Sequence, residues 1–318
     1  MTRLTESEQL KLGGDIQRRL GIKTSRNEPL ARFSTMRVGG PADLFAEVYN
    51  LFELRGIARF ARSRDVPLFL IGAGSDLVIS DAGIGGLVVR VRAGAVRTDG
   101  ERIVADPGVL MAKLATEGKK AGLSGLEFGL AIPGTVGGSV WANAGAHGSD
   151  VKGVLESAQV VGADGEERQL GPEELGMAYR ETQLKHSAPG RPEVVVAATF
   201  RLEPAEPDTI AERLGSIRRW RQEHQPIGQR SAGSVFRNPD GDSAGRIIDE
   251  LGLKEHSVGG AQVSPRHANF IVNTGGATAA DVRRLGEFLR ETARRERGIE
   301  LAYEVEFVGD WPAPEEGT

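Results

Sequence analysis

Three polar side chains have the types needed to stabilise charge or to move a proton. Arg180 follows an aromatic residue, Ser234 follows a glycine, and Glu304 lies in the mostly apolar run 301–308. An arginine can stabilise a developing negative charge, and a serine or a glutamate can transfer a proton. Each residue also has an ordinary structural interpretation, namely a surface ion pair, a loop-to-strand junction and a solvated sheet face. The residues alone leave both interpretations open.

The run 301–308 is predicted to be a strand, in which alternate side chains point to opposite faces. One face would carry Tyr303, Val305 and Phe307, and the other Ala302, Glu304 and Glu306. Two glutamates on one face are more often solvated than functional. Glu306 is therefore interpreted as a solvated residue.

Several other chemistries have no support in the sequence. The chain has no cysteine, and its five histidines have no paired spacing that would bind a metal. It contains no Gly-x-Ser-x-Gly motif, and no P-loop lysine follows a glycine run. Hydrolase, phosphotransferase and metal-dependent mechanisms are not indicated.

A glycine-rich stretch over residues 132–148 is predicted to hold an anionic cofactor. It contains five glycines, one proline and mostly small residues. Glycine allows positive φ and close approach, and successive backbone N–H groups in such a turn can bind a diphosphate. The alternative is a tightly packed turn between core elements.

A second glycine turn, 72–74, follows the apolar run 66–71. This arrangement suggests a dinucleotide-binding fingerprint, but the third glycine is missing and a strand is predicted after the turn instead of a helix. The Rossmann interpretation is rejected.

Composition limits the class of protein. The 318 residues are enough for two or three domains, and the net charge of −4 argues against a general nucleic-acid binder. The N-terminus has no signal-peptide-like apolar run, and no segment is apolar enough to span a bilayer. We expect a soluble, cytoplasmic protein with no membrane or nucleic-acid partner.

Hydrophobic periodicity predicts alternating helices and strands. Helices are expected at 5–20, interrupted by Gly13 and Gly14, and at 51–62, 109–121, 208–223, 247–251 and 279–297; strands are expected at 42–48, 66–71, 77–79, 87–91, 194–202, 268–272 and 301–308. Asp-Gly pairs predict hairpins at 96–104 and 160–168. Thr278 and Asp281 have the spacing of a capping box, and residues 203–207 are predicted to be a linker.

Taken in order, these motifs resemble the UDP-N-acetylenolpyruvoylglucosamine reductase family. The motifs are TMRVGGPAD (35–43), GAGSDL (72–77), IPGTVGG (132–138), NAGA (143–146), YR (179–180), GSVFRNP (233–239), VSPRHANF (263–270) and EV (304–305). The resemblance runs from about Phe33 to Gly309. The chain resembles the shorter subtype, because there is no room near 190–194 for the tyrosine-bearing insertion of the longer one.

The resemblance implies an α+β, vanillyl-alcohol-oxidase-type FAD-binding fold of two subdomains plus a smaller α+β substrate-binding domain. The implied divisions are a peripheral N-terminal helix (1–20), FAD-binding subdomains at 21–90 and 91–205, a substrate-binding domain at 206–310 and a tail at 311–318.

The resemblance also implies the cofactors FAD and NADPH, a UDP-sugar enolpyruvyl substrate and a set of site residues. Arg180 and Glu304 would stabilise the charge that develops next to the substrate carboxylate, and Ser234 would deliver the proton. The implied cofactor-binding residues are Gly72, Gly74, Ser75, Asp76, Leu77, Ile132, Pro133, Gly134, Thr135, Gly137, Gly138, Asn143, Gly145 and Gly148. The implied substrate-binding residues are Arg237, Asn238, Gln262, His267 and Asn269. Alternatives are a flavin oxidase of the same fold and a non-catalytic flavin-binding module.

Four residues depart from the family pattern, and Thr182 in place of serine is a mild change. Asp76 stands where asparagine is usual, so it either faces away from the diphosphate and accepts backbone N–H bonds or weakens flavin affinity. Arg237 replaces a lysine, which preserves the charge and changes its geometry. His147 replaces a tyrosine and is interpreted as a packing substitute.

Overall fold

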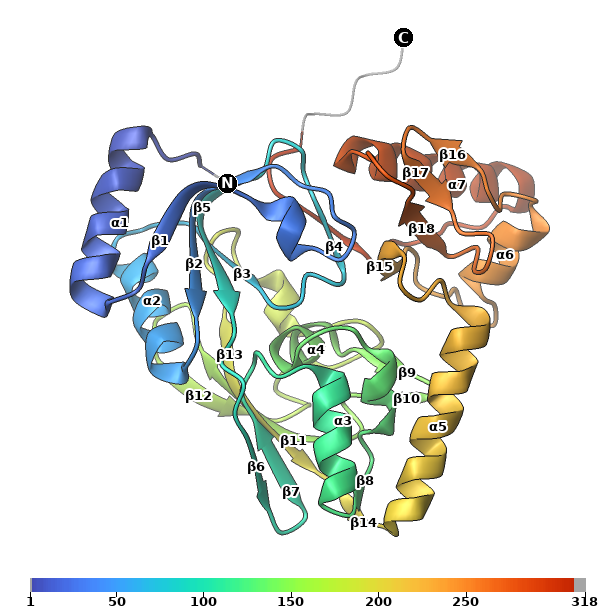
Figure 1. The fold of residues 1–318 in the computed structure, drawn as a ribbon, viewed down its shortest axis with the longest axis horizontal. Coiled ribbons are helices and arrows are strands. Elements are labelled where there is room, and N and C mark those ends of the chain that lie inside the picture. Colours follow the sequence, from blue (N-terminus) through green and yellow to red (C-terminus); the bar gives the residue numbers. More distant parts are fainter. Residues whose placement is uncertain (1, 312–318) are drawn as a thin grey trace.

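The computed structural model describes residues 2–311, which fold into three larger β-sheets with helices packed against them (Figure 1). The mixture of helix and strand confirms the α+β class. The predicted tail, apart from Trp311, lies outside the described residues. The strands of the three sheets fall within 24–91, 96–201 and 230–273. The predicted domain boundaries themselves stay a prediction.

The first sheet has the strand order β1-β2-β5-β3, with β2 and β3 parallel to β5 and β1 antiparallel to β2. Its elements are α1 (Glu6–Leu20), β1 (Thr24–Pro29), β2 (Pro41–Val48), α2 (Leu51–Ser63), β3 (Leu68–Ile71) and β5 (Ile84–Val91). Helix α1 continues through Gly13 and Gly14, so the predicted interruption is wrong. A Cβ at Gly13 would lie only 2.7 Å from Thr24 Oγ1, which shows that the glycine allows β1 to pack closely.

The second sheet has the order β12-β11-β13-β7-β6 and is antiparallel throughout. Its elements are β6 (Val96–Asp99), β7 (Arg102–Ala105), α3 (Met111–Lys120), α4 (Val136–Ala142), β11 (Leu155–Val161), β12 (Glu167–Leu170) and β13 (Val194–Arg201). Both predicted Asp-Gly hairpins are confirmed as β6–β7 and β11–β12. Val136 and Val140 of α4 pack in the same core as Phe200 of β13.

The third sheet has the order β15-β18-β17-β16 and is also antiparallel. Its elements are β15 (Arg230–Ser234), α6 (Ala244–Glu250), β16 (Ser257–Val258), β17 (Ala261–Val263), β18 (Phe270–Asn273) and α7 (Ala279–Arg297). Helix α7 begins with the predicted capping box between Thr278 and Asp281. The long helix α5 (Pro207–His224) leads from the second sheet to the third (Figure 1).

Short elements connect the sheets. They are η1 (Leu30–Phe33), β4 (Leu77–Ile79), β8 (Leu123–Ser124), η2 (Glu127–Ala131), β9 (Gly145–Ala146), β10 (Ser149–Asp150), η3 (Gln183–His186), β14 (Glu203–Pro204) and β19 (Glu306–Val308). Strand β14 pairs with β8, so the predicted linker is partly a strand. Strand β19 pairs in parallel with β4, which returns the C-terminal segment to the region of the first sheet.

The predicted strand at 301–308 is wrong over most of its length. Only Glu306–Val308 forms β19, and before it Tyr303 makes one isolated bridge to Phe236. The segment passes from the third sheet to β4, so no single partner strand runs along it. It still buries Val305 and leaves Glu304 and Glu306 on the opposite side.

Candidate active site

A large cavity lies where the glycine turns, helix α5, strand β15 and the 304–309 segment meet. Its volume is about 1150 Å³, which exceeds the roughly 300–1,000 Å³ typical of sites for drug-sized ligands. A cavity of this size has room for a dinucleotide together with part of a second molecule. Its lining contains residues from all three sheet regions.

The glycine-rich stretch provides one wall and fits a bound diphosphate. A Cβ added at Gly134 or Gly138 would make only ordinary van der Waals contacts, none closer than 3.4 Å, and both glycines line the cavity. The nearby Ser139 is only 2% exposed, and its Oγ has no hydrogen-bond partner among the described residues. A buried hydroxyl without a partner beside an open cradle is the arrangement expected of a site for a polar ligand.

Other glycines of the two turns let the protein backbone pack closely behind this wall. A Cβ at Gly137 would lie 2.9 Å from Pro107 Cβ, and a Cβ at Gly72 would clash with the Thr135 side chain. Residues 136–142 form the short helix α4, where a turn was predicted. These glycines therefore serve close packing, and Gly134 and Gly138 leave space for a ligand.

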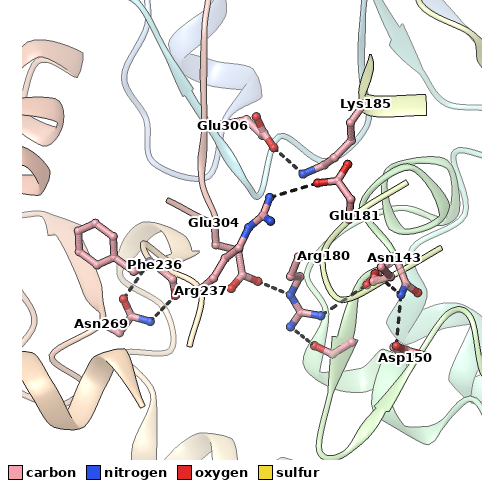
Figure 2. A network of polar contacts seen from close by, with 12 residues as sticks. Asn143, Asp150, Arg180, Glu181, Lys185, Phe236, Arg237, Asn269, Glu304 and Glu306 are labelled. Atoms are coloured by element: carbon pink, nitrogen blue, oxygen red, sulfur yellow. Dashed lines mark hydrogen bonds and ion pairs between the residues drawn. The ribbon is translucent and has the colours of Figure 1, made fainter. Parts of the chain in front are cut away.

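Arg180 reaches into the cavity from a strained backbone position, with φ of 56°. Its Nε donates to Glu304 Oε1 at 2.6 Å and its Nη2 donates to the Gly145 carbonyl at 2.6 Å (Figure 2). Strain of this kind at a non-glycine residue is typical of functional sites. The guanidinium is thus fixed between the glycine-rich stretch and the C-terminal segment.

A backbone hydrogen bond holds the segment of Ser234 beside the segment of Glu304. The Glu304 N–H donates to the Val235 carbonyl at 2.8 Å, and both Ser234 and Glu304 line the cavity. Gly233, with φ of 78°, turns the chain so that it faces the Ser75 carbonyl. The structure therefore brings Arg180, Ser234 and Glu304 together from widely separated parts of the chain.

Asn269 fixes the segment that carries Ser234. Its side-chain Oδ1 accepts the Phe236 N–H at 2.9 Å, and its Nδ2 donates to the Phe236 carbonyl at 2.8 Å (Figure 2). These two bonds use one donor and one acceptor site of the amide, so Asn269 orients the chain at Phe236, and its assignment to substrate stays a prediction.

Lys185 and Glu306 form a second ion pair beside the first and were missed in the sequence. Lys185 Nζ lies 2.7 Å from Glu306 Oε1 and 4.7 Å from the centroid of the Trp141 ring. Both residues line the cavity, so the interpretation of Glu306 as a solvated residue is wrong. The alternation that places Glu304 and Glu306 on one face was the sequence signal that could have assigned Glu306 to the site. Nothing in the sequence connected Lys185 to them.

Most predicted site residues line the cavity. They are Gly72, Gly74, Ser75, Asp76, Leu77, Ile132, Pro133, Gly134, Thr135, Gly137, Gly138, Gly145, Arg180, Ser234, Asn238, His267, Asn269 and Glu304. Four predicted residues, Asn143, Gly148, Arg237 and Gln262, are not part of the lining. Asn143 is buried and its side-chain amide donates to the Ala178 carbonyl, so it fixes the turn that precedes Arg180.

Arg237 and Gln262 use their side chains elsewhere. Arg237 Nη2 lies 3.8 Å from Glu181 Oε2 (Figure 2), and Gln262 donates to the Glu255 carbonyl. The replacement of lysine by arginine at 237 thus makes a contact with the residue next to Arg180. Neither Arg237 nor Gln262 lines the cavity, so the cavity does not support their prediction as substrate-binding residues.

Burial favours the neutral form of two histidines in the cavity wall. Burial lowers the pKa of His267, whose Nδ1 accepts the Asn269 N–H. Burial, with the nearby Arg221 charge, also lowers the pKa of His147, which packs edge-on against Trp220 at 5.0 Å. The contact between His147 and Trp220 supports the interpretation of His147 as a packing residue.

The described residues contain neither a cluster of side chains able to hold a metal ion nor a helix long and apolar enough to cross a membrane.

Comparison with known proteins defines the class. Residues 42–171 match a family model described as an FAD binding domain. The solved structure of p-cresol methylhydroxylase covers 92% of this chain with a TM-score of 0.56 at 11% identity, which shows a shared fold. The family model and the shared fold define a protein with an FAD binding domain and a fold of the vanillyl-alcohol-oxidase type.

More similar proteins define the family. Residues 225–308 match the model of the UDP-N-acetylenolpyruvoylglucosamine reductase C-terminal domain. Proteins named UDP-N-acetylenolpyruvoylglucosamine reductase from Bacillus velezensis and Rubrobacter xylanophilus are 40% and 42% identical; the aligned regions cover 90% and 89% of this chain and 94% and 95% of those proteins. The crystal structure of the reductase from Thermus caldophilus has a TM-score of 0.76 and 35% identity, covering 92% of this chain and 99% of that one. The chain belongs to the UDP-N-acetylenolpyruvoylglucosamine reductase family.

Proposed function

We propose that this protein reduces UDP-N-acetylglucosamine-enolpyruvate to UDP-N-acetylmuramate with NADPH as the reductant. The reaction would supply a precursor of peptidoglycan in the cytoplasm. The observation that carries the proposal is the convergence of Arg180, Ser234 and Glu304 on one cavity that also has a diphosphate cradle. Family membership over nearly the whole chain supports it.

Bound FAD would supply the chemistry of accepting a hydride from NADPH and passing it to the substrate. The chain's own residues would hold the cofactor through the turns at 72–77 and 132–138, where Gly134 and Gly138 leave room and Ser139 offers a free hydroxyl. Backbone N–H groups in such turns bind phosphate oxygens.

Addition of a hydride to the methylene carbon of an enol ether leaves negative charge beside the substrate carboxylate. The Arg180 guanidinium is already oriented by Glu304 and by the Gly145 carbonyl, so it can stabilise this charge without reorganising. Ser234 would give the proton to the adjacent carbon as a general acid. Asn238 and His267, which line the same cavity, would contact the substrate, and Asn269 would keep Ser234 in place.

Ser234→Ala tests the proposal by stopped-flow absorbance in two half-reactions. Bleaching of the flavin by NADPH should keep its rate, because no proton from Ser234 is needed in that step. Recovery of the colour with the enolpyruvyl substrate should slow by about 10²- to 10⁴-fold, the usual contribution of a positioned general acid.

Ser231→Ala is the matched control, because Ser231 lies on the same strand and also lines the cavity. Its backbone carbonyl, which accepts the Thr35 hydroxyl, remains in the variant. Both half-reactions should persist there. If Ser234→Ala behaves like this control, Ser234 is not the acid; if the wild type is not bleached by NADPH, the proposed reaction itself fails.

A further inference from the structure

Three carboxyl groups share one wall of the cavity. Strand β19 pairs with β4 so that the Glu306 N–H donates to the Asp76 carbonyl at 2.9 Å. This pairing sets Asp76 beside the segment that carries Glu304 and Glu306, and all three residues line the cavity. Asp76 is the second residue after the glycine turn 72–74, where the cofactor diphosphate is expected.

Within the described part of the chain, two cations, Arg180 and Lys185, act on these three carboxyl groups, and each is already paired. Arg180 donates to Glu304 at 2.6 Å, and Lys185 donates to Glu306 at 2.7 Å (Figure 2). Among residues 2–311, no cation lies within ion-pair distance of the Asp76 carboxyl group, and no backbone N–H donates to it. The expectation that Asp76 turns away and accepts backbone N–H bonds is therefore wrong.

We propose that Asp76 enters the FAD site as an uncharged carboxylic acid and donates a hydrogen bond to the bound cofactor. A carboxylic acid has one donor and a carbonyl acceptor, so it resembles the amide of asparagine in shape and in hydrogen bonding. The third carboxyl of the wall would thereby avoid repulsion both from the two glutamates and from the diphosphate. The inference rests on FAD binding, but not on the identity of the substrate.

The electrostatics of the wall agree with this proposal. Burial, followed by the negative charges of Glu304 and Glu306, raises the pKa of Asp76 well above its usual range. Lys185 and Arg180 oppose this shift in the pKa of Asp76, but burial, which is the largest cause, and the two glutamates keep the net direction upward. Burial and like charges both favour the neutral form of a carboxyl group.

The proposal predicts a dependence of FAD affinity on pH. Below the raised pKa the acid donates a hydrogen bond; above it, the carboxylate loses its donor and repels the diphosphate. FAD should therefore bind tightly at low pH and more weakly as the pH rises through the pKa of Asp76. Asp76→Asn has a permanent donor and no charge, so its affinity should not change over the same interval.

The experiment follows release of FAD from the diluted holoenzyme by flavin fluorescence, from about pH 5 to about pH 9, where buried carboxyl groups with raised pKa titrate. The wild type should lose at least about tenfold in affinity, the equivalent of about 1.4 kcal/mol. Asp76→Asn should hold the low-pH affinity throughout. Glu306→Gln, which removes one repelling charge, should move the wild-type midpoint to lower pH.

Infrared spectroscopy supplies a second readout that does not depend on binding. The carbonyl band of a protonated carboxyl group should be present in the wild-type holoenzyme at neutral pH and absent in Asp76→Asn. A missing band, or equal pH profiles for the two proteins, would overturn the proposal. Neither result bears on reductase turnover, which is measured separately with the enolpyruvyl substrate.

Discussion

At the scale of single residues, Ser139 is the clearest sign of a site for a polar ligand. It lies on α4, where its backbone N–H and carbonyl are both bonded, to the Thr135 carbonyl and the Ala144 N–H. Only its buried hydroxyl lacks a partner. A buried polar group without a partner costs about 1–3 kcal/mol, which a ligand oxygen would recover.

Ser139→Ala should weaken FAD binding by about 1 kcal/mol, or roughly fivefold, because one hydrogen bond to the ligand is lost. The change can be measured as the dissociation constant of FAD by fluorescence titration. The apoprotein should unfold at the same or a higher urea concentration, since alanine favours the helix and leaves no unpaired hydroxyl. Ser216→Ala, at an exposed position of α5, is the control. Unchanged affinity in Ser139→Ala would remove the hydroxyl from the cofactor site.

Candidate site residues could be predicted from the sequence where they belong to a recognisable motif. Arg180, Ser234 and Glu304 came from an ordered resemblance, and the structure brings all three to the cavity. Lys185 could not be found in this way, because its function follows from a pairing with Glu306 that lies 121 positions away. A partner at that distance is created by the fold and leaves no local pattern.

At the scale of elements, the N-terminus of α7 is capped from two directions. Thr278 and Asp281 form the capping box within the helix. In addition, the carboxylate of Asp81, from the loop between β4 and β5, accepts the N–H groups of Ala279 at 2.8 Å and Ala280 at 2.9 Å. These donors have no partner within the helix, so Asp81 joins the third sheet region to the first.

Asp81→Ala should lower the free energy of unfolding by about 1–2 kcal/mol, because two donors at the helix start lose a charged acceptor. Urea denaturation followed by circular dichroism measures the change. Asp81→Asn keeps one acceptor and should lose less. Asp240→Ala, at an exposed loop position, should leave stability within about 0.5 kcal/mol. A loss in Asp240→Ala equal to that in Asp81→Ala would show that the capping contact contributes nothing specific.

Elements with strong periodicity were predicted well, and those defined by distant contacts were not. The capping box of α7 and both Asp-Gly hairpins follow from local chemistry and were confirmed. The segment 301–308 was assigned as one strand because its apolar residues alternate, but only three residues find a partner in β4. Helix α4 was missed because glycine and small residues give a weak helical signal, and its packing against Pro107 comes from the fold.

At the scale of the molecule, the cavity is lined by residues from all three sheet regions, so a ligand bound there should stabilise the whole protein. Anything that binds only the folded state adds RT ln(1 + [L]/Kd), about 2.7 kcal/mol at a hundredfold excess over Kd. FAD added to the apoprotein should therefore raise the melting temperature in proportion to the logarithm of its concentration. ADP alone should raise it less, because it occupies part of the site. A melting temperature independent of FAD would contradict cofactor binding in this cavity.

The pairing of β19 with β4 also has a consequence for the protein during its synthesis. The cavity wall that carries Glu304 and Glu306 is held by the pairing of β19 with β4. In this pairing Glu306 lies beside Leu77, more than 220 positions earlier in the chain. The turn at 72–77 and the C-terminal wall are therefore held together by a contact that can form only after residues 306–308 have been synthesised. The cavity reaches its final form late in translation, because its lining includes residues up to Gly309.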